Sequence, residues 1–450
     1  MKTMLSIRNR EASCAKSSLT SRVRDCRVIF HLCLLSGIVL LAGCSKAGTN
    51  KPEVTLSLDS VDACRIALAP TPAPDQKLSE LQAKARINAD ERSLDALGWA
   101  FIEKARTAYD PGYYKIAESC AACLETRSPG NPSALLLRGH ALDSLHRFSE
   151  AEAIARQLVS VRGLYLDYEL LGDALMEQGK MSEAVAAYQS MMDLKPGPEA
   201  YSRAAHMRWL TGDLDGAIEM MTLAARGAGS GEPAAWAETR LAVYLLQTGS
   251  LKLALAACNE ALNLQPNYAP ALLAKSRILL VQGQVDDALA ILRTATRLNP
   301  LPDYQWVLAE ALRAARQYEE VEVTETQIAE RGAETDPRTV ALFLATRQLK
   351  PETALTLARK EFENRQDAYT RDTLAWTLYA AGQFVEARQM MKQVLAVGTN
   401  DARFFLHAGL IAAKCGDKQE ARSYCRRATS IKQMLLPTEQ EILAKQMTAL

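Results

Sequence analysis

The stretch APALLAKSRILLVQGQVDDALAILRTATRLNP, residues Ala269–Pro300, contains two short apolar helical patterns joined at a glycine. A small side chain marks each pattern, Ser276 in the first and Ala288 in the second, where two antiparallel helices can approach closely. Gly283 stands between the patterns, because glycine can take the left-handed conformation that ends a helix. Pro300 closes the stretch, since proline cannot continue a helix. The stretch therefore predicts a helix–turn–helix unit.

The same spacing of small residues recurs along the chain, at steps of 33 or 34 residues apart from two insertions. The copies are recognised at Gly98 and Ala117, Gly139 and Ala151, Gly172 and Ala184, Ala205 and Ala217, Ala242 and Ala254, Ser276 and Ala288, Ala309 and Val321, Leu342 and Ala354, Ala375 and Ala387, and Gly409 and Ala421. One unit cannot bury its apolar face alone, so neighbouring units must stack on one another.

This period resembles the tetratricopeptide repeat (TPR), a helix–turn–helix unit of 34 residues. The resemblance covers residues 77–432 and implies an all-α solenoid of about ten repeats that forms a right-handed superhelix. Three positions depart from the pattern, because His146, Arg316 and Leu349 stand where the turn glycine is expected. We expect the unit around Leu342, the poorest match, to be a distorted or mobile joint.

Charge and composition limit the classes of function. The chain has 53 Lys and Arg against 52 Asp and Glu, so its formal net charge is +1. That balance argues against a protein that works mainly by coating nucleic acid. Apolar residues make up 48% of the chain but aromatic residues only 6%, which favours packed helices over β-sandwiches. We therefore expect an all-α protein without a nucleic-acid partner.

The first 43 residues have the organisation of a signal peptide. Seven Lys or Arg and two acidic residues precede an apolar run over residues 28–42, which is shorter than the about 20 residues of a spanning helix. The run ends in Leu-Ala-Gly-Cys at Cys44, which resembles the lipobox of bacterial lipoproteins, where the cysteine is lipidated and becomes the mature N-terminus. The alternative is an ordinary secretory signal followed by a chance cysteine.

Lipidation of Cys44 has consequences for location. Ser45 would be the second residue of the mature chain, which in the lipoprotein family implies delivery to the outer membrane, facing the periplasm. Acyl chains such as palmitate contribute about 0.8 kcal/mol per buried methylene, so several of them make anchoring permanent. Removal of residues 1–43 leaves 46 basic and 50 acidic residues, and the formal charge becomes −4.

Two segments lie outside the predicted repeats. Residues 44–76 show no helical period and have alternating prolines between residues 69 and 74, which predicts an extended tether. Residues 433–450 are predicted to form a terminal helix that covers the last repeat. Thr438 and Glu441 have the spacing of a capping box at its start.

All five tryptophans, Trp99 included, fall at first-helix positions that usually line the concave groove of a TPR solenoid. The predicted groove residues are Trp209, Trp236, Trp306, Trp376, Tyr379, His206, Arg277, Glu310 and Arg313. Tryptophan combines a large contact area with a polar group and is enriched at binding hot spots. The mixed charges favour an extended or helical segment of a protein as the occupant. The alternative is that these rings fill the seams between repeats.

Cys120 and Cys123 are separated by two alanines, and in a periplasmic protein a C-x-x-C pair can be redox active. Redox pairs normally open a helix, whereas this pair falls inside one, so a structural disulfide or unpaired thiols are favoured. Cys258 and Cys425 stand at a core position of the repeat, which predicts small buried side chains. No partner is assigned to Cys64 and Cys415, because pairing cannot be deduced from sequence.

The sequence has no metal-ligand spacing, phosphate-binding glycine loop or nucleophile elbow, so we expect no catalytic residue, metal or cofactor. The favoured function is a membrane-anchored periplasmic scaffold, similar to TPR lipoproteins that assist secretion, pilus or exopolysaccharide-export complexes. Its partners would be a protein segment in the groove and the lipid bilayer through Cys44. The alternatives are a polysaccharide-binding solenoid, whose rings stack on sugars, and, less favoured, a redox protein that uses Cys120 and Cys123.

Overall fold

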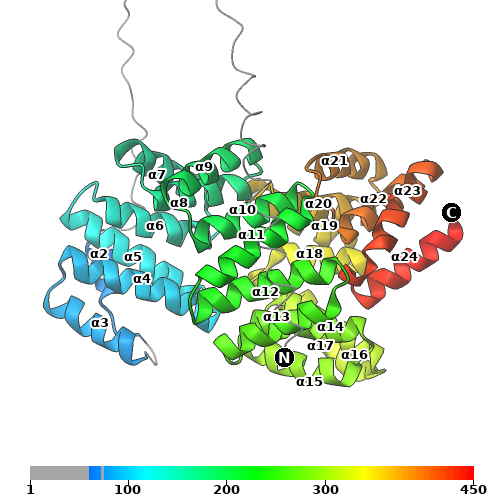
Figure 1. Ribbon diagram of the computed structural model, residues 1–450, viewed down its shortest axis with the longest axis horizontal. Coiled ribbons are helices and arrows are strands. Elements are labelled where there is room, and N and C mark those ends of the chain that lie inside the picture. The colour runs from blue at the N-terminus through cyan, green and yellow to red at the C-terminus, as the bar shows by residue number, and fades with distance from the viewer. Residues whose placement is uncertain (1–59, 72–74) are drawn as a thin grey trace, which may run out of the picture. The chain divides into compact units, whose positions relative to one another are not determined.

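The computed structural model describes residues 60–71 and 75–450 (Figure 1). Within these ranges the regular elements are 23 α-helices and two 3₁₀ turns, without a strand. The predicted leader, Cys44 and residues 45–59 of the predicted tether lie outside the described residues. No helix in the described ranges is both long enough and apolar enough to span a bilayer.

Ten consecutive helix pairs correspond to the ten predicted repeats (Figure 1). They are α4 (Glu91–Ala108) with α5 (Gly112–Arg127), α6 (Pro132–Ser144) with α7 (Phe148–Val161), α8 (Tyr165–Glu177) with α9 (Met181–Leu194), α10 (Pro198–Leu210) with α11 (Leu214–Gly227), α12 (Glu232–Gln247) with α13 (Leu251–Leu264), α14 (Ala269–Val281) with α15 (Val285–Leu298), α16 (Pro302–Ala314) with α17 (Tyr318–Arg331), α18 (Pro337–Thr346) with α19 (Pro351–Asn364), α20 (Ala368–Ala380) with α21 (Phe384–Ala396), and α22 (Ala402–Lys414) with α23 (Lys418–Ser430). Each pair packs on the next pair, so the predicted all-α solenoid is confirmed.

The small residues of the repeat are required by close contacts. A Cβ atom added at Gly98 would lie 2.2 Å from Cδ2 of Leu137, which belongs to the next pair. A Cβ atom at Gly172 would lie 2.4 Å from Cε1 of Tyr188, which belongs to the same pair. Both separations are far shorter than a van der Waals contact. The pattern in the sequence therefore reports packing both within a pair and between successive pairs.

Each pair has a residue with left-handed backbone at the turn between its two helices. Gly283 is one such residue, with φ of 76°. His146 and Arg316 take the same place with φ of 59° and 61°, although this conformation costs a residue with a side chain about 1 kcal/mol or more. In the eighth pair Gln348, with φ of 55°, stands at the place of the turn glycine, so the predicted exception at Leu349 is wrong by one position.

The eighth pair is irregular, as its poor match to the repeat predicts. Its first helix, α18, has ten residues and follows a 3₁₀ turn, η2 (Gly332–Glu334). Lys350 precedes α19 in left-handed backbone, with φ of 43°. Val340 and Phe343 are nevertheless fully buried, so the pair remains part of the core. The predicted distortion is confirmed, and the predicted mobility stays a prediction.

Two helices precede the first pair, α2 (Ser60–Ala67) and α3 (Gln76–Ile87). The extended tether predicted over residues 44–76 is wrong for residues 60–67, which form α2. This helix packs on α5 and buries Ala63 and Ala67. Eight residues make only two helical turns, so a helix of this length has too little periodic signal to be separated from a linker.

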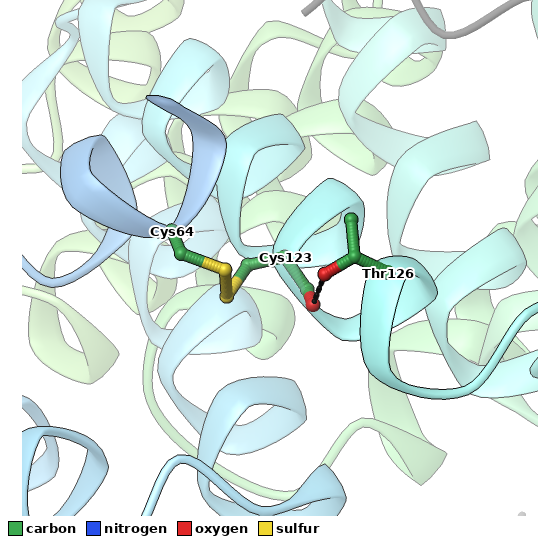
Figure 2. The surroundings of a disulfide bond; sticks show 3 residues. All are labelled: Cys64, Cys123 and Thr126. Carbon is green, nitrogen blue, oxygen red and sulfur yellow. Dashed lines mark hydrogen bonds between the residues drawn. A yellow bond between two sulfur atoms is a disulfide. The ribbon is translucent and has the colours of Figure 1, made fainter. Parts of the chain in front are cut away.

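A disulfide joins Cys64 of α2 to Cys123 of α5, and Figure 2 shows it beside the hydroxyl of Thr126, which donates to the Cys123 carbonyl. Cys120 is free and buried, and burial raises the pKa of its thiol. The hypothesis of a Cys120–Cys123 redox pair is wrong for this structure, because Cys123 is already bonded. Closing a loop of 59 residues stabilises a fold by about 4 kcal/mol in the chain-entropy account.

After α23 the chain forms a 3₁₀ turn, η3 (Lys432–Met434), and a last helix, α24 (Pro437–Ala449). The predicted terminal helix is therefore present, and it contacts α16 as well as α22 and α23. The predicted capping residue Glu441 is wrong. The helix begins at Pro437, so the carboxylate of Glu439 reaches back and accepts the Leu436 N–H at 2.8 Å.

Repeats that are far apart in the sequence also touch. The backbone N–H of Gln366, which precedes α20, donates to the carbonyl of Glu177 at the end of α8, at 2.9 Å. The amide of Gln247 at the end of α12 donates to the carbonyl of Asn400, which follows α21, at 2.6 Å. We call these interactions, between α8–α12 and the segments that precede α20 and follow α21, the closing contact.

The disulfide arrangement can be tested by alkylation of denatured protein before and after reduction, followed by peptide mass spectrometry. We expect Cys120, Cys258, Cys415 and Cys425 to react without reductant, because they are free. Cys64 and Cys123 should react only after reduction. Recovery of a Cys120–Cys123 link in place of the Cys64–Cys123 link would contradict this arrangement.

Candidate functional site

Three of the predicted groove tryptophans are buried. Trp209 on α10, Trp306 on α16 and Trp376 on α20 expose 6%, 1% and 4% of their surface. Their indole N–H groups donate, in that order, to Gln247 Oε1 at 2.7 Å, Glu310 Oε1 at 3.4 Å and Thr346 Oγ1 at 3.0 Å. The prediction that these rings face an open groove is corrected, because large apolar rings with satisfied N–H groups are stable in the core. These three rings instead fill the seams between repeats, as the alternative interpretation predicts.

Burial of these rings also bears on the polysaccharide alternative, which depended on exposed faces that stack on sugars. Trp376 is stacked on the ring of His407 at 4.1 Å between centroids and on half-buried Tyr379 at 4.7 Å. Trp209 is stacked on Tyr369 at 5.9 Å. The faces of these two indoles are therefore used inside the protein.

The other predicted residues differ in their exposure. Trp236 on α12 is 38% exposed, so it is the tryptophan of the predicted groove set whose face can reach a partner. Arg313 donates to Glu325 Oε1 at 2.6 Å, so its charge is paired within the chain. His206 is half-buried beside Trp209, and burial lowers its pKa to about 3, so the ring is neutral at pH 7.

Arg277 and Glu310 do bind a peptide segment, and the segment belongs to the same chain. The guanidinium of Arg277 on α14 donates to the carbonyl of Met434 at 2.7 Å. Glu310 on α16 accepts from the backbone N–H of Thr438 at 2.9 Å and from its hydroxyl at 2.8 Å. We call residues 432–449 the C-terminal segment. It occupies positions that the repeat pattern assigns to a ligand.

An ion pair with a buried carboxylate and three leucines hold the C-terminal segment. Nε of Arg403 on α22 lies 2.6 Å from Oε1 of Glu439, which is 1% exposed. Burial alone raises the pKa of Glu439, but the charge and hydrogen bond of Arg403 outweigh burial, so its pKa lies below the ordinary value. Glu310 forms no ion pair with any described residue, and burial raises its pKa. The buried leucines are Leu435, Leu436 and Leu443.

The remaining cysteines have structural positions. Cys258 and Cys425 are fully buried, as predicted, and a Cβ atom at Gly409 would lie 2.5 Å from Sγ of Cys425. Cys415 is half-buried and donates to the Phe384 carbonyl at 3.5 Å. Among the described residues, no three His, Cys, Asp or Glu side chains lie close enough together to hold a metal ion.

The sequence reveals neither the occupant of the groove nor a set of arginines that meet at the closing contact. The repeat register identifies which positions face inward, but not which distant segment covers them. The Leu435–Leu436 pair directly before a helix start was an available signal for a buried C-terminal segment. The sequence gives no indication of a basic cluster, because acidic residues are interspersed among Arg338, Arg365 and Arg371.

The two buried carboxylates of this region should respond differently to neutralisation. Glu439→Gln leaves the half-buried Arg403 without its charge partner, so we expect the free energy of unfolding at pH 7 to fall by about 3 kcal/mol. Glu310→Gln keeps the oxygen that accepts from Thr438 and loses only the longer bond from the Trp306 N–H at 3.4 Å, so its effect should be smaller, about 1 kcal/mol. Chemical denaturation, with hydrogen exchange over residues 432–449, measures both effects.

The pH dependence follows from the same ion pair. The folded-state pKa of Glu439 is lowered, so its stabilisation is present above about pH 4.5 and is lost as the pH falls through the folded pKa. In Glu439→Gln this acid-induced loss should be smaller than in the wild type. Equal destabilisation by Glu310→Gln and Glu439→Gln at pH 7 would contradict the assigned roles.

Comparison with known proteins agrees with the helix pairs. Family models described as tetratricopeptide repeat match residues 136–199, 169–233, 245–315 and 373–433, which together are more than half of the chain. The matched residues cover the helices α6–α11, α13–α16 and α20–α23. A search of curated proteins finds no matching sequence.

Solved structures are similar at a low level. A human IFIT1 dimer with PPP-AAAA has 13% identity and a TM-score of 0.46, covering 80% of this chain and 96% of that chain. A tetratricopeptide repeat protein from Parabacteroides merdae has 17% identity and a TM-score of 0.32, covering 56% and 97%. Yeast Tom70 has 13% identity and a TM-score of 0.36, covering 84% and 96%. By its matched repeats, the chain belongs to the tetratricopeptide repeat proteins, whose repeats indicate a protein–protein interaction scaffold.

Proposed function

We propose that this chain is a lipid-anchored scaffold on the periplasmic side of the bacterial outer membrane, where it holds a protein partner. Its work would be to assist assembly of an envelope complex of the secretion, pilus or exopolysaccharide-export kind. The helix pairs occupy the chain from α4 to α23, and only α2, α3, η3 and α24 lie outside them in the described ranges. This arrangement supports a binding role over a catalytic one.

The Cys64–Cys123 disulfide is the observation that supports the proposed compartment. Structural disulfides persist in oxidising compartments such as the periplasm and are rare in the cytosol. The basic leader and the apolar run that ends at Cys44 indicate export on separate grounds. A disulfide near the start of the folded body and a lipobox-like cysteine before it favour the same location.

Trp236 is the residue to which we assign contact with the partner. The C-terminal segment already covers Glu310 and Arg277, and Trp209, Trp306 and Trp376 are buried. Trp236 has an exposed face of a residue type that is enriched at binding hot spots. A segment of a partner protein would therefore bind at α12.

Membrane attachment is tested by Cys44→Ser in the source cells or a bacterial host. The substitution removes the thiol to which acyl chains would be attached, so the protein should move from the membrane fraction to the soluble periplasmic fraction. Cys415→Ser is the matched control and should stay with the membrane. Retention of the Cys44→Ser protein in the membrane fraction would refute the lipid anchor.

Partner contact is tested by replacing Trp236 with a photoreactive phenylalanine analogue in living cells. We expect light to produce one discrete adduct, which mass spectrometry identifies as an envelope protein. Val385 on α21 is 70% exposed and is the matched control position, where no such adduct should form. The same adducts at both positions, or none at Trp236, would argue against this docking site.

A further inference from the structure

A cavity of about 250 Å³ lies at the closing contact. One wall is formed by the end of α8, by α10 and by Arg240 of α12. The opposite wall is formed by Arg338 of α18 and by Arg365 and Arg371, which flank the start of α20. The cavity therefore exists only because repeats far apart in the sequence meet. It is independent of Trp236 and of the C-terminal segment.

The walls of the cavity are held at a fixed separation. The carbonyl of Gln366 approaches Gly179 so closely that a Cβ atom there would lie 2.4 Å from it. Gln366 also donates its backbone N–H to the carbonyl of Glu177. Trp209 and Tyr369 stack across the contact with centroids 5.9 Å apart. These contacts hold the connection over residues 365–367 and the start of α20 against the end of α8 and α10, so the side chains around the cavity are fixed in place.

Four guanidinium groups and two carboxylates line this cavity. Arg365 pairs with Glu177 at 2.5 Å and with Asp367 at 3.0 Å. Arg338 lies 3.6 Å from Asp367, and its Nη1 is buried without a hydrogen-bond acceptor. The two carboxylates thus balance the charges of these two arginines.

The other two arginines are unbalanced. Neither Arg240 nor Arg371 forms an ion pair with a described residue, and Nε of Arg371 is buried without an acceptor. Burying a guanidinium donor without a partner is unfavourable, so such groups indicate a missing acceptor. The lining accordingly carries two positive charges in excess.

Acids outside the lining do not add a carboxylate to the cavity. Asp336 is not among the lining residues, and its oxygens accept the backbone N–H and the hydroxyl of Thr339, at 3.0 and 2.6 Å. Burial raises the pKa of Glu361 and raises that of Asp143 well above its ordinary value, so both favour the uncharged form more than exposed carboxyls do. His206 at the cavity is neutral and adds no charge of its own.

We propose that this cavity, the arginine pocket, binds a small phosphate-bearing anion. The planar guanidinium presents paired N–H donors that match the oxygens of a phosphate, and such charge-assisted bonds are the strong ones. A phosphate monoester carries close to two negative charges at pH 7, which equals the excess in the lining. The volume is at the small end of ligand pockets, so the ligand is inorganic phosphate or a small monoester rather than a polymer.

The test is calorimetric titration and thermal unfolding of the full-length protein with inorganic phosphate and with glucose 6-phosphate, against chloride at equal ionic strength. We expect one site per chain, and a higher midpoint of unfolding with the ligand, since a ligand that binds only the folded state stabilises it. The tighter of the two probes identifies the source of the phosphate group, either the free ion or a small monoester.

Two variants, one from each wall of the pocket, test whether the arginines bind the anion. Arg371→Gln and Arg240→Gln should each weaken binding at least tenfold. Neither should lower the midpoint without ligand, because each removes an unbalanced charge. Arg331→Gln, an exposed arginine on α17, is the matched control and should bind as the wild type does. No stabilisation beyond chloride with either probe, or undiminished binding by both pocket variants, would overturn the proposal.

Discussion

The closing contact is the constraint on which the rest of this structure depends. In an open repeat array each unit touches only its neighbours, and stability is a sum of local terms. Here the Thr399 hydroxyl donates to the Leu210 carbonyl at 2.7 Å, between residues 189 positions apart. Gly212 and Gly398 approach so closely that a Cβ atom at Gly212 would lie 2.7 Å from the Gly398 carbonyl oxygen. Distant repeats therefore stabilise one another.

This contact converts much of the face that would bind a ligand into interior. Trp209 lies within the contact, stacked on Tyr369 and bonded to Gln247, so its polar group is satisfied without a partner. The C-terminal segment covers a further part through Glu310 and Arg403. What stays accessible is local, namely Trp236 on α12 and the arginine pocket between the two walls of the contact. The proposed partner contact at Trp236 and the proposed anion site are therefore separate and small, and they do not form one continuous groove.

The sequence predicts the repeats well because each small residue and each turn reports a contact between neighbours. Ser276, Gly283 and Ala288 suffice to place a helix pair, and His146 shows that the turn conformation persists even where glycine is replaced. The exception is the eighth pair, where the turn moves to Gln348. Local sequence patterns therefore predict the position of a turn to within about one residue.

The candidate sites could be predicted only in part, since they depend on contacts between distant repeats. The register predicted that Arg277 and Glu310 face a segment of a partner protein, whereas both bind the C-terminal segment of the same chain, about which the register contains no information. It placed Trp306 and Trp376 on the same face, and whether such rings are exposed depends on what packs over them. The pairing of Cys64 with Cys123 likewise required knowing that residues 60–67 fold back onto α5.

The most direct test of the central claim is native-state hydrogen exchange at the backbone amide of Gln366. This amide lies between α19 and α20 and donates to Glu177, a residue from a distant repeat. If the closing contact forms, its exchange should be slowed at least a hundredfold relative to an unstructured amide, although it lies outside any helix. Exchange of Gln366 at the unstructured rate, while the amides of α19 and α20 stay protected, would show an open array and contradict the account.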